Sequence, residues 1–501
     1  MSAIPSLHDA FDGARPALPN SLLEDLPLPA LRILTCGSVD DGKSTLIGRL
    51  LWDATDLADD VRASLVGGGN ADGTAVPDFS RLLDGLVAER EQGITIDVAW
   101  RYFDTPTRRI VVIDSPGHEQ YTRNMASGAS HADVAILLVD ARHGVKTQTR
   151  RHAAILDLMG VKRVILAVNK MDLVGYRESV FREIERQFQP LTRHFGFLEH
   201  TAIPLAAVTG ENVTRGSAAM PWYGGPTLIE CLEAAPGRAA DQSAPLRFPV
   251  QRVLRDGRDL RGLGGTVAAG EVSVGDSVVD VASGREARVA RIVTFDGDLK
   301  TARTGQAVVI ALDRDLDIAR GNVLASPMRA PVSAIEIEAR LVWLSDDPFD
   351  PRGGYLLRTT TDIATISRLE ITAELDLATF ASQPASTASS NDIVSASIVL
   401  GRAVACEPFT EAPVTGSFLV VDAITGTTVA AGTVAEASAK SRRSGTAGRG
   451  PEFRLDRSVL ARGLCRDIDD TFEGRAEFAR RVEEVALLLK AAGIDAVRDG
   501  N

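Results

Sequence analysis

The segment GSVDDGKS, from Gly37 to Ser44, constrains this 501-residue chain more than any other feature. It fits the pattern G-x-x-x-x-G-K-[ST], follows the apolar stretch LRILTC and precedes the helix-forming stretch TLIGRLLWDA. In such a strand–loop–helix context, glycines let the backbone wrap around a phosphate, and N–H groups at the helix N-terminus face the anion. A chance glycine-rich turn is the weaker interpretation, because the full motif and both flanks are present. The sequence therefore predicts a phosphate-binding loop.

Several residues of this loop have predicted roles. Lys43 is expected to reach the β- and γ-phosphates, and the Ser44 hydroxyl is expected to bind Mg²⁺. The residues predicted to line the phosphate site are Gly37, Asp41, Gly42, Lys43, Ser44 and Thr45.

Three further apolar runs favour a parallel sheet around this loop. RIVVI at 109–113, VAILLV at 134–139 and VILAV at 164–168 alternate with longer amphipathic stretches. Continuous Val/Ile/Leu runs of this length are typical of strands that are buried on both faces of a sheet. The alternation of strands and helices predicts a doubly wound α/β domain.

After the linker AAPGRAADQS the pattern becomes one of short strands separated by Gly and Asp turns, which is typical of β-barrels. A second β region begins near Ser333, and a helix with Phe478, Val482, Val485 and Leu489 on one face follows near the C-terminus. We therefore expect a flexible leader at 1–30, an α/β domain at 31–240, β-barrels at 244–330 and 331–436, a linker at 437–451 and a short α-helical unit at 452–501.

Composition excludes several classes of protein. Lys and Arg number 55 and Asp and Glu number 67, so the net charge is 55 − 67 = −12. An acidic chain is a poor candidate for extensive contact with nucleic-acid phosphates, and no apolar run reaches the roughly 18–20 residues of a membrane helix. The N-terminus has no secretory pattern, and the four cysteines are scattered without a CxxC. We expect a cytoplasmic protein with reduced thiols that binds neither nucleic acid nor membrane.

Asp114 and Gly117 form a second motif, in the segment VVIDSPGH. A carboxylate at the end of a hydrophobic strand suits a Mg²⁺ position downstream of a phosphate loop, and the N–H of Gly117 can reach a γ-phosphate. The pattern D-x-x-G is common by itself, but its place after a valine-rich strand makes it persuasive.

The segment Asn169-Lys170-Met171-Asp172 follows the third apolar run. The Asp172 carboxylate can accept hydrogen bonds from N1 and N2 of guanine, a donor pair that adenine lacks. Asn169 and the stem of Lys170 would hold the base at its edge and face. A surface turn is the alternative, and the order of the motifs makes it the weaker one. The sequence thus predicts a guanine nucleotide as ligand, with GTP and Mg²⁺ as cofactors.

Two more residues complete the predicted site. Thr95, in QGITID, can supply a second hydroxyl ligand to Mg²⁺, and His118, directly after Gly117, can orient an attacking water. His118, Lys43 and Thr95 are the predicted catalytic residues, and Ser44, Thr95 and Asp114 are the predicted metal ligands. A lone loop histidine is usually structural, but the surrounding motifs favour a functional role for His118. The run Arg150-Arg151-His152 is interpreted as a solvated helix face.

These motifs resemble the translation-factor class of GTPases. More narrowly, GSVDDGKSTLIGRLL, DGLVAEREQGITIDVAWRYF, IDSPGHEQYTRNMASGAS and QTRRHAAILDLMGVKRVILAVNKMDLV look like the GTPase subunit, subunit 1, of bacterial sulfate adenylyltransferase. The resemblance covers about residues 31–435 and includes stretches of both β regions. It implies an α/β P-loop GTPase domain followed by two β-barrel domains, and a smaller catalytic subunit as partner. That partner would form adenosine 5′-phosphosulfate and pyrophosphate from ATP and sulfate, driven by GTP hydrolysis on this chain.

Two regions depart from the family pattern. The guanine-side loop usually reads Ser-Ala-Leu, whereas here Ala206 takes the serine place and Ala207 is kept, with its N–H expected to reach guanine O6. Residues 454–497 resemble an internal piece of adenylylsulfate kinase and keep GLCRD at 463–467. Ser458 and Val459 replace the second Asp and the Asn of that pattern, and the preceding segment SAKSRRSGTAGRGPEF holds no phosphate loop. We interpret 452–501 as a degenerate kinase-like fragment without kinase activity.

Other functions remain as alternatives. A translation-type GTPase that delivers tRNA would share the fold, a regulatory partner with inactive GTPase chemistry would lack the intact motifs, and a bifunctional enzyme with kinase activity would need a second phosphate loop. A homologue that supplies activated sulfate for a secreted signal molecule would carry much the same residues as one that serves sulfate assimilation.

Overall fold

The structure is a computed structural model, and it describes residues 30–54, 79, 97–237, 244–256, 260–439, 453–455, 471–491 and 496–498. Residues 1–29 of the expected leader, the run that contains Thr95, and most of the expected linkers and kinase-like fragment lie outside the described residues. No helix among the described residues is long and apolar enough to cross a membrane.

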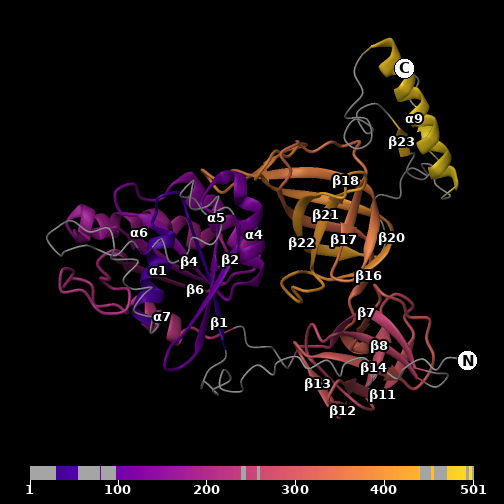
Figure 1. Cartoon of the computed structure of the whole chain (residues 1–501), viewed down its shortest axis with the longest axis horizontal. Helices are drawn as coiled ribbons and strands as arrows, with labels where there is room; N and C mark the ends of the chain where they lie inside the picture. Colours follow the sequence, from indigo (N-terminus) through magenta and orange to yellow (C-terminus); the bar gives the residue numbers. More distant parts are fainter. Residues whose placement is uncertain are drawn as a thin grey trace, which may run out of the picture.

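The N-terminal domain, described between residues 30 and 237, is a six-stranded sheet with helices on both faces (Figure 1). The strand order is β2-β3-β1-β4-β5-β6, and only the edge strand β2 is antiparallel to its neighbour. The predicted α/β fold is therefore confirmed. Its strands are β1 (Leu31–Gly37), β2 (Ala99–Asp104), β3 (Arg109–Asp114), β4 (Val134–Asp140), β5 (Arg163–Asn169) and β6 (Glu199–Pro204).

The helices of this domain divide into two groups. The described helical elements are α1 (Lys43–Ala54), η3 (Glu119–Tyr121), α4 (Thr122–His131), α5 (Thr147–Leu158), η4 (Met171–Val174), α6 (Glu178–His194) and α7 (Leu228–Ala234). Apolar side chains of α1 and α7 share one core cluster, and those of α4, α5 and α6 share another. Strand β4 is buried along its whole length because its side chains enter both clusters.

The first barrel comprises strands β7 to β15. The ring β10-β15-β7-β8-β14-β11 closes through the pairing of β10 with β11, and the β11–β12 hairpin extends from it. The strands are β7 (Arg247–Asp256), β8 (Leu260–Thr266), β9 (Glu271–Ser273), β10 (Ser277–Asp280), β11 (Glu286–Thr294), β12 (Gly297–Leu299), β13 (Thr301–Arg303), β14 (Ala307–Leu312) and β15 (Val323–Ala325).

The second barrel comprises strands β16 to β22 and follows the short helix η5 (Pro327–Arg329). Its ring β17-β21-β22-β16-β20-β18 closes through the pairing of β17 with β18 around a core that includes Trp343. The strands are β16 (Val332–Trp343), β17 (Tyr355–Arg358), β18 (Ile363–Leu375), β19 (Ser382–Pro384), β20 (Ile393–Cys406), β21 (Ser417–Asp422) and β22 (Thr428–Ser438). Both predicted barrels are thus present.

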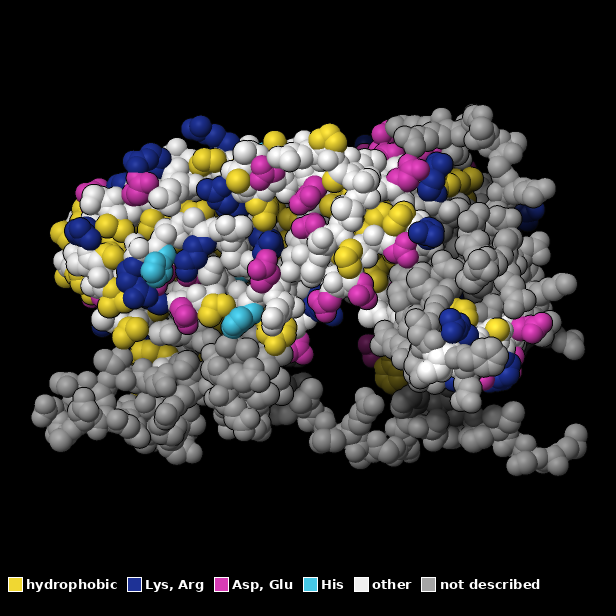
Figure 2. Space-filling view, turned by 90° about the horizontal axis from the view of Figure 1, so that it is seen from above, with side chains coloured by type: hydrophobic (Ala, Val, Ile, Leu, Met, Phe, Trp, Pro, Cys, Tyr) yellow, Lys and Arg dark blue, Asp and Glu magenta, His cyan; other side chains and the backbone are white. Residues whose placement is uncertain are grey.

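The second barrel lies between the N-terminal domain and the first barrel (Figure 1). Val342, Leu344 and Phe380 of this barrel belong to the core cluster of the N-terminal domain. Arg340 Nη1 lies 2.9 Å from Asp157 Oδ2 at the same boundary. Seen from above, the two parts form a continuous body whose face carries both basic and acidic side chains (Figure 2).

A buried ion pair joins the two barrels. Arg247 of β7 donates to both carboxylate oxygens of Glu407, at 2.7 and 2.6 Å, and both residues are buried. Glu407 also accepts a hydrogen bond from Thr415. Bidentate geometry and a further donor are what a buried carboxylate requires, so this pair fixes how the barrels meet.

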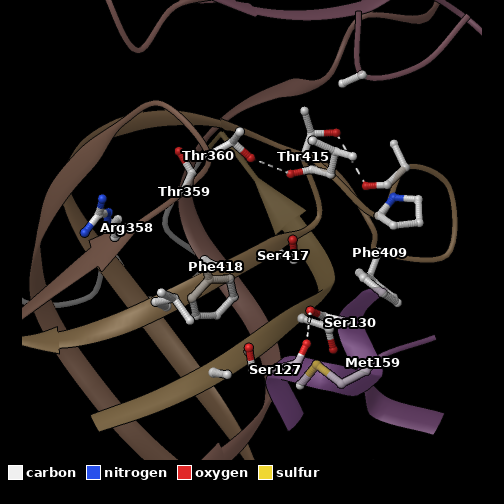
Figure 3. A pocket seen from close by; sticks show the side chains of 18 of the residues that line it. Ser127, Ser130, Met159, Arg358, Thr359, Thr360, Phe409, Thr415, Ser417 and Phe418 are labelled. Atoms are coloured by element: carbon white, nitrogen blue, oxygen red, sulfur yellow. Dashed lines mark hydrogen bonds between the residues drawn. The ribbon is translucent and has the colours of Figure 1, made fainter. Parts of the chain in front are cut away.

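A cleft of about 1290 Å³ opens where the three parts meet. Ser127 and Ser130 of α4 and Met159 line it on one side, and Phe409 and Phe418 of the second barrel line it on the other (Figure 3). Phe409 packs against Gly160, where a Cβ would lie 2.7 Å from the ring. None of the described residues predicted to bind nucleotide lines this cleft.

Near the C-terminus, β23 (Phe453–Leu455) pairs in parallel with β24 (Ala496–Arg498), and α9 (Phe472–Ala491) lies between them in the sequence. The helix predicted from Phe478, Val482, Val485 and Leu489 therefore forms. The described part of this unit is a β-α-β arrangement.

Candidate functional site

The phosphate loop connects β1 to α1, and Lys43 is the first residue of that helix. Lys43 is buried, and its Nζ lies 3.1 Å from the carbonyl oxygen of Gly37 and 2.9 Å from that of Ser38. Burial lowers the pKa of Lys43, while the charge of Asp114 opposes that shift. Ser44 and Thr45 lie in the first helical turn, where N–H groups lack helical acceptors. The loop therefore offers N–H donors and one ammonium group to an anion.

Gly42 is required by the backbone. Its φ is +92°, a conformation that L side chains rarely adopt, and a Cβ there would collide with Nδ2 of Asn169. A Cβ at Gly37 would come within 2.8 Å of the carbonyl oxygen of Leu138 in β4. These two glycines thus let the loop pass close to the ends of the neighbouring strands.

Asn169 connects three loops that are far apart in the sequence. Its Nδ2 donates to the carbonyl oxygen of Asp41 at 2.9 Å, and its Oδ1 accepts from the N–H of Lys170 at 2.8 Å and of Ala207 at 3.0 Å. Asn169 is buried, and its hydrogen bonds with Asp41 and Ala207 are sheltered from water. The phosphate loop, the NKMD segment and the loop after β6 are therefore held together by one side chain.

Asp140 supports Lys170 and was missed at the level of sequence. It ends β4 beside Asn169, and its Oδ2 lies 3.1 Å from Lys170 Nζ. Burial opposes ionisation of Asp140, but hydrogen bonds from Arg142 and Lys170 outweigh it and lower the pKa of the carboxyl group. Lys170 itself has φ +63° and donates to the carbonyl oxygen of Asp40. An acidic residue directly after a buried strand, as at Asp114, was the signal that could have identified Asp140.

The residues at the ends of β3 and β1 fit a Mg²⁺ ion. Asp114 ends β3, is buried, and its Oδ1 lies 3.3 Å from the hydroxyl of Thr35 in β1. Among the described residues there is no cluster of three or more acidic, His or Cys side chains that could hold a metal. Mg²⁺ suits such a place, because proteins bind it through one or two carboxylates together with hydroxyl, water and substrate phosphate oxygens. Thr95, the other predicted ligand, lies outside the described residues.

Gly117 and His118 follow Asp114 at the same edge of the sheet. A Cβ at Gly117 would collide with Lys43 Nζ, which places this glycine directly against the phosphate loop. His118 is partly buried, and its ring makes an edge contact with Tyr121 at 6.2 Å between ring centroids. Asp172, in η4, is also partly exposed.

The segment after His118 contacts the second barrel. Asn391 Nδ2 donates to the carbonyl oxygen of Glu119 at 3.1 Å, and Arg123 Nη2 donates to that of Leu344 at 3.2 Å. The Glu119 side chain accepts from Arg151 of α5. The segment that carries His118 is therefore tied to the barrel on one side and to α5 on the other.

The prediction that residues 150–152 form a solvated helix face is wrong. His152 is fully buried, and burial together with Lys43 and Arg151 lowers its pKa to about 3. Arg150 donates to the carbonyl oxygen of Ala378 in the second barrel at 2.9 Å, and Arg151 pairs with Glu119. Charged side chains face inward here because α5 lies at the boundary between the N-terminal domain and the second barrel, which the helical pattern alone does not reveal.

Two family descriptions match the chain. "Elongation factor Tu GTP binding domain" matches residues 29–253, and "GTP-eEF1A C-terminal domain-like" matches residues 336–435. The first match covers the phosphate loop, His118 and the NKMD segment, and the second covers most of the second barrel.

Three relatives match most of the chain. Bifunctional enzyme NodQ of Rhizobium sp. (strain N33) is 43% identical over 509 aligned residues, which cover 93% of this chain and 79% of the relative. Sulfate adenylyltransferase subunit 1 of Rhizobium meliloti (strain 1021) is 44% identical, with 92% and 91% covered. Sulfate adenylyltransferase subunit 1 of Rhizobium rhizogenes (strain K84) is 47% identical, with 81% and 82% covered.

Proposed function

The chain belongs to the family of sulfate adenylyltransferase subunit 1, and from this premise we propose that it couples GTP hydrolysis to the formation of adenosine 5′-phosphosulfate by a catalytic partner subunit. The observation that carries the proposal is the convergence of three motifs at the C-terminal ends of β1, β3 and β5, with Asn169 joining the first to the third. Ligands of open α/β sheets bind at this edge.

The proposed roles of the residues rest on the sequence motifs and, for the described residues, also on their positions at one edge of the sheet. Lys43 and the N–H groups at the start of α1 would bind the phosphates, and Ser44, Thr95 and Asp114 would hold Mg²⁺. When bound, Mg²⁺ neutralises charge that develops on the phosphate oxygens. Gly117 would bind the γ-phosphate through its N–H, and His118 would orient the attacking water. The partner is expected to hold the ATP and sulfate site.

Asp172 would select the base. Asn169, Lys170 and Ala207 would surround the guanine, with Asp172 accepting from N1 and N2. In the structure the N–H of Ala207 donates to Asn169 Oδ1, so we propose that Ala207 acts chiefly by positioning Asn169. Asp140 holds Lys170 in the same way.

Asp172→Asn is expected to reverse base preference. An amide can donate to the carbonyl oxygen at position 2 of xanthine but loses one acceptor for guanine. GTP affinity should fall by about 10- to 100-fold, in keeping with about 1.5–3 kcal/mol for a hydrogen bond to a charged group. Competition between GTP and xanthosine triphosphate against a fluorescent nucleotide measures this. Equal loss for both nucleotides would contradict base reading by Asp172.

The coupling itself is tested by product formation. The full chain is mixed with the small subunit encoded in the same genome, and adenosine 5′-phosphosulfate formed from ATP and sulfate is measured with and without GTP. We expect product to rise with GTP and the rise to vanish when Lys43→Ala replaces the parent chain. Normal GTP hydrolysis without any effect on product would refute the coupling and favour a tRNA-delivering GTPase, which binding of aminoacyl-tRNA would then test.

We also propose that residues 452–501 are a degenerate adenylylsulfate-kinase-like fragment. The parallel pair of β23 and β24 around α9 supports this, because β-α-β units build the sheets of phosphate-loop kinases. The sequence before it has no second phosphate loop, so no kinase activity is expected.

A further inference from the structure

Asp41 places a buried carboxyl group inside the phosphate loop, where burial raises its pKa and the charge of Lys146 opposes that shift. Its side chain is 2% exposed, and its Oδ2 accepts from the N–H of Ser38 at 2.6 Å. Its Oδ1 is buried and has no hydrogen-bond donor among the described residues. A carboxylate placed this way disfavours a further anion nearby, because Coulomb repulsion is strong where water is excluded. A nearby positive charge must offset this repulsion if the phosphate loop is to bind the phosphates of GTP.

Lys146 is the cation placed to do so. Its Nζ lies 3.6 Å from Asp41 Oδ1, an ion pair rather than a hydrogen bond, and its side chain is 37% exposed. It immediately precedes α5, whose first residue is Thr147. The ammonium group of Lys146 therefore approaches the phosphate loop from the start of α5, a helix that carries none of the predicted nucleotide motifs.

The other nearby cations are already engaged. Lys43 Nζ faces the carbonyl oxygens of Gly37 and Ser38 and is the group expected to meet phosphate. Lys170 and Arg142 pair with Asp140, whose own charge adds to the negative potential at Asp41. Among the described residues, Asp41 forms its ion pair with Lys146.

We propose that Lys146 is a positioning residue for GTP binding, which neutralises Asp41 and so keeps the phosphate loop in a shape and charge state that accept the nucleotide. This inference rests on the proposed GTPase function and adds a residue that the nucleotide motifs do not contain. Lys146 acts through Asp41 and touches no reacting atom. Its loss should therefore raise KM for GTP and leave kcat nearly unchanged.

The test is a set of variants of the full chain, assayed for GTP hydrolysis with the partner subunit present. Lys146→Met, which keeps length but removes charge, is expected to raise KM for GTP by about tenfold or more, because it leaves the buried Asp41 carboxylate without its cation. Lys146→Arg should stay close to the parent. The double variant Asp41→Asn/Lys146→Met should recover most of the loss, because asparagine can still accept from the Ser38 N–H but carries no charge.

A matched control is Arg163→Met. Arg163 also pairs with a carboxylate, Glu199 at 2.8 Å, but at the start of β5, the end opposite Asn169. This exposed pair should change KM by less than about twofold. If Lys146→Met also changes KM by less than twofold, or if the double variant is as weak as the single one, the inference is overturned. If the parent chain itself does not bind GTP, the proposed function fails and the inference fails with it.

Discussion

Lys43→Ala is expected to abolish measurable GTP binding. The ammonium group is the single cation inside the described part of the phosphate loop, and it lies against the carbonyl oxygens of Gly37 and Ser38 at 3.1 and 2.9 Å. Its loss removes at least two charge-assisted hydrogen bonds to phosphate at about 1.5–3 kcal/mol each, which corresponds to roughly a 1000-fold loss of affinity. Titration of a fluorescent GTP analogue measures the effect.

The control for this variant is Lys162→Ala. Lys162 directly precedes β5, at the far end of the strand from Asn169, and is partly exposed. It should bind GTP like the parent. Retention of GTP affinity within about tenfold by Lys43→Ala would remove Lys43 from the phosphate site.

His118→Ala should separate binding from hydrolysis. His118 follows Gly117, which lies against Lys43, so this residue comes directly after the place expected to face the γ-phosphate. A positioned group that orients water or moves a proton contributes about 100- to 10,000-fold to rate. We expect kcat for GTP hydrolysis in the complex to fall by that range and GTP affinity to change little.

Tyr121→Phe is the matched control for His118. It keeps the aromatic edge contact with the imidazole ring and removes only a hydroxyl. Its hydrolysis rate should match that of the parent. If His118→Ala hydrolyses GTP at the parent rate in the active complex, the assigned role of His118 is wrong.

The fold of the N-terminal domain could be predicted from the sequence because each of three nucleotide motifs directly follows an apolar run that forms a strand. The apolar runs before Gly37, Asp114 and Asn169 became β1, β3 and β5, and parallel strands bring their carboxyl ends to one edge. The apolar pattern of each segment was therefore enough to predict that residues more than a hundred positions apart lie at one edge of the sheet.

Other parts of the site depend on tertiary contacts and could not be predicted. Lys146 and Asp41 meet only because α5 begins beside the phosphate loop, and His152, which lies on α5, is buried only because that helix packs against the sheet and the second barrel. The N–H of Ala207 donates to the Asn169 side chain, a contact between two loops that the sequence does not indicate. No periodic pattern of apolar and polar residues along the sequence predicts any of these contacts.

The spatial order of the three parts differs from their order along the chain. Asn391 and Leu344 of the second barrel hold the segment after His118, and the Arg247–Glu407 pair fastens the first barrel to the second. The first barrel, which lies below the second barrel in Figure 1, is thus connected to the segment after His118 through the second barrel. At the tip of the β11–β12 hairpin of that barrel, Phe295 is 95% exposed, so the first barrel presents a large apolar side chain to solvent far along the chain from the phosphate loop.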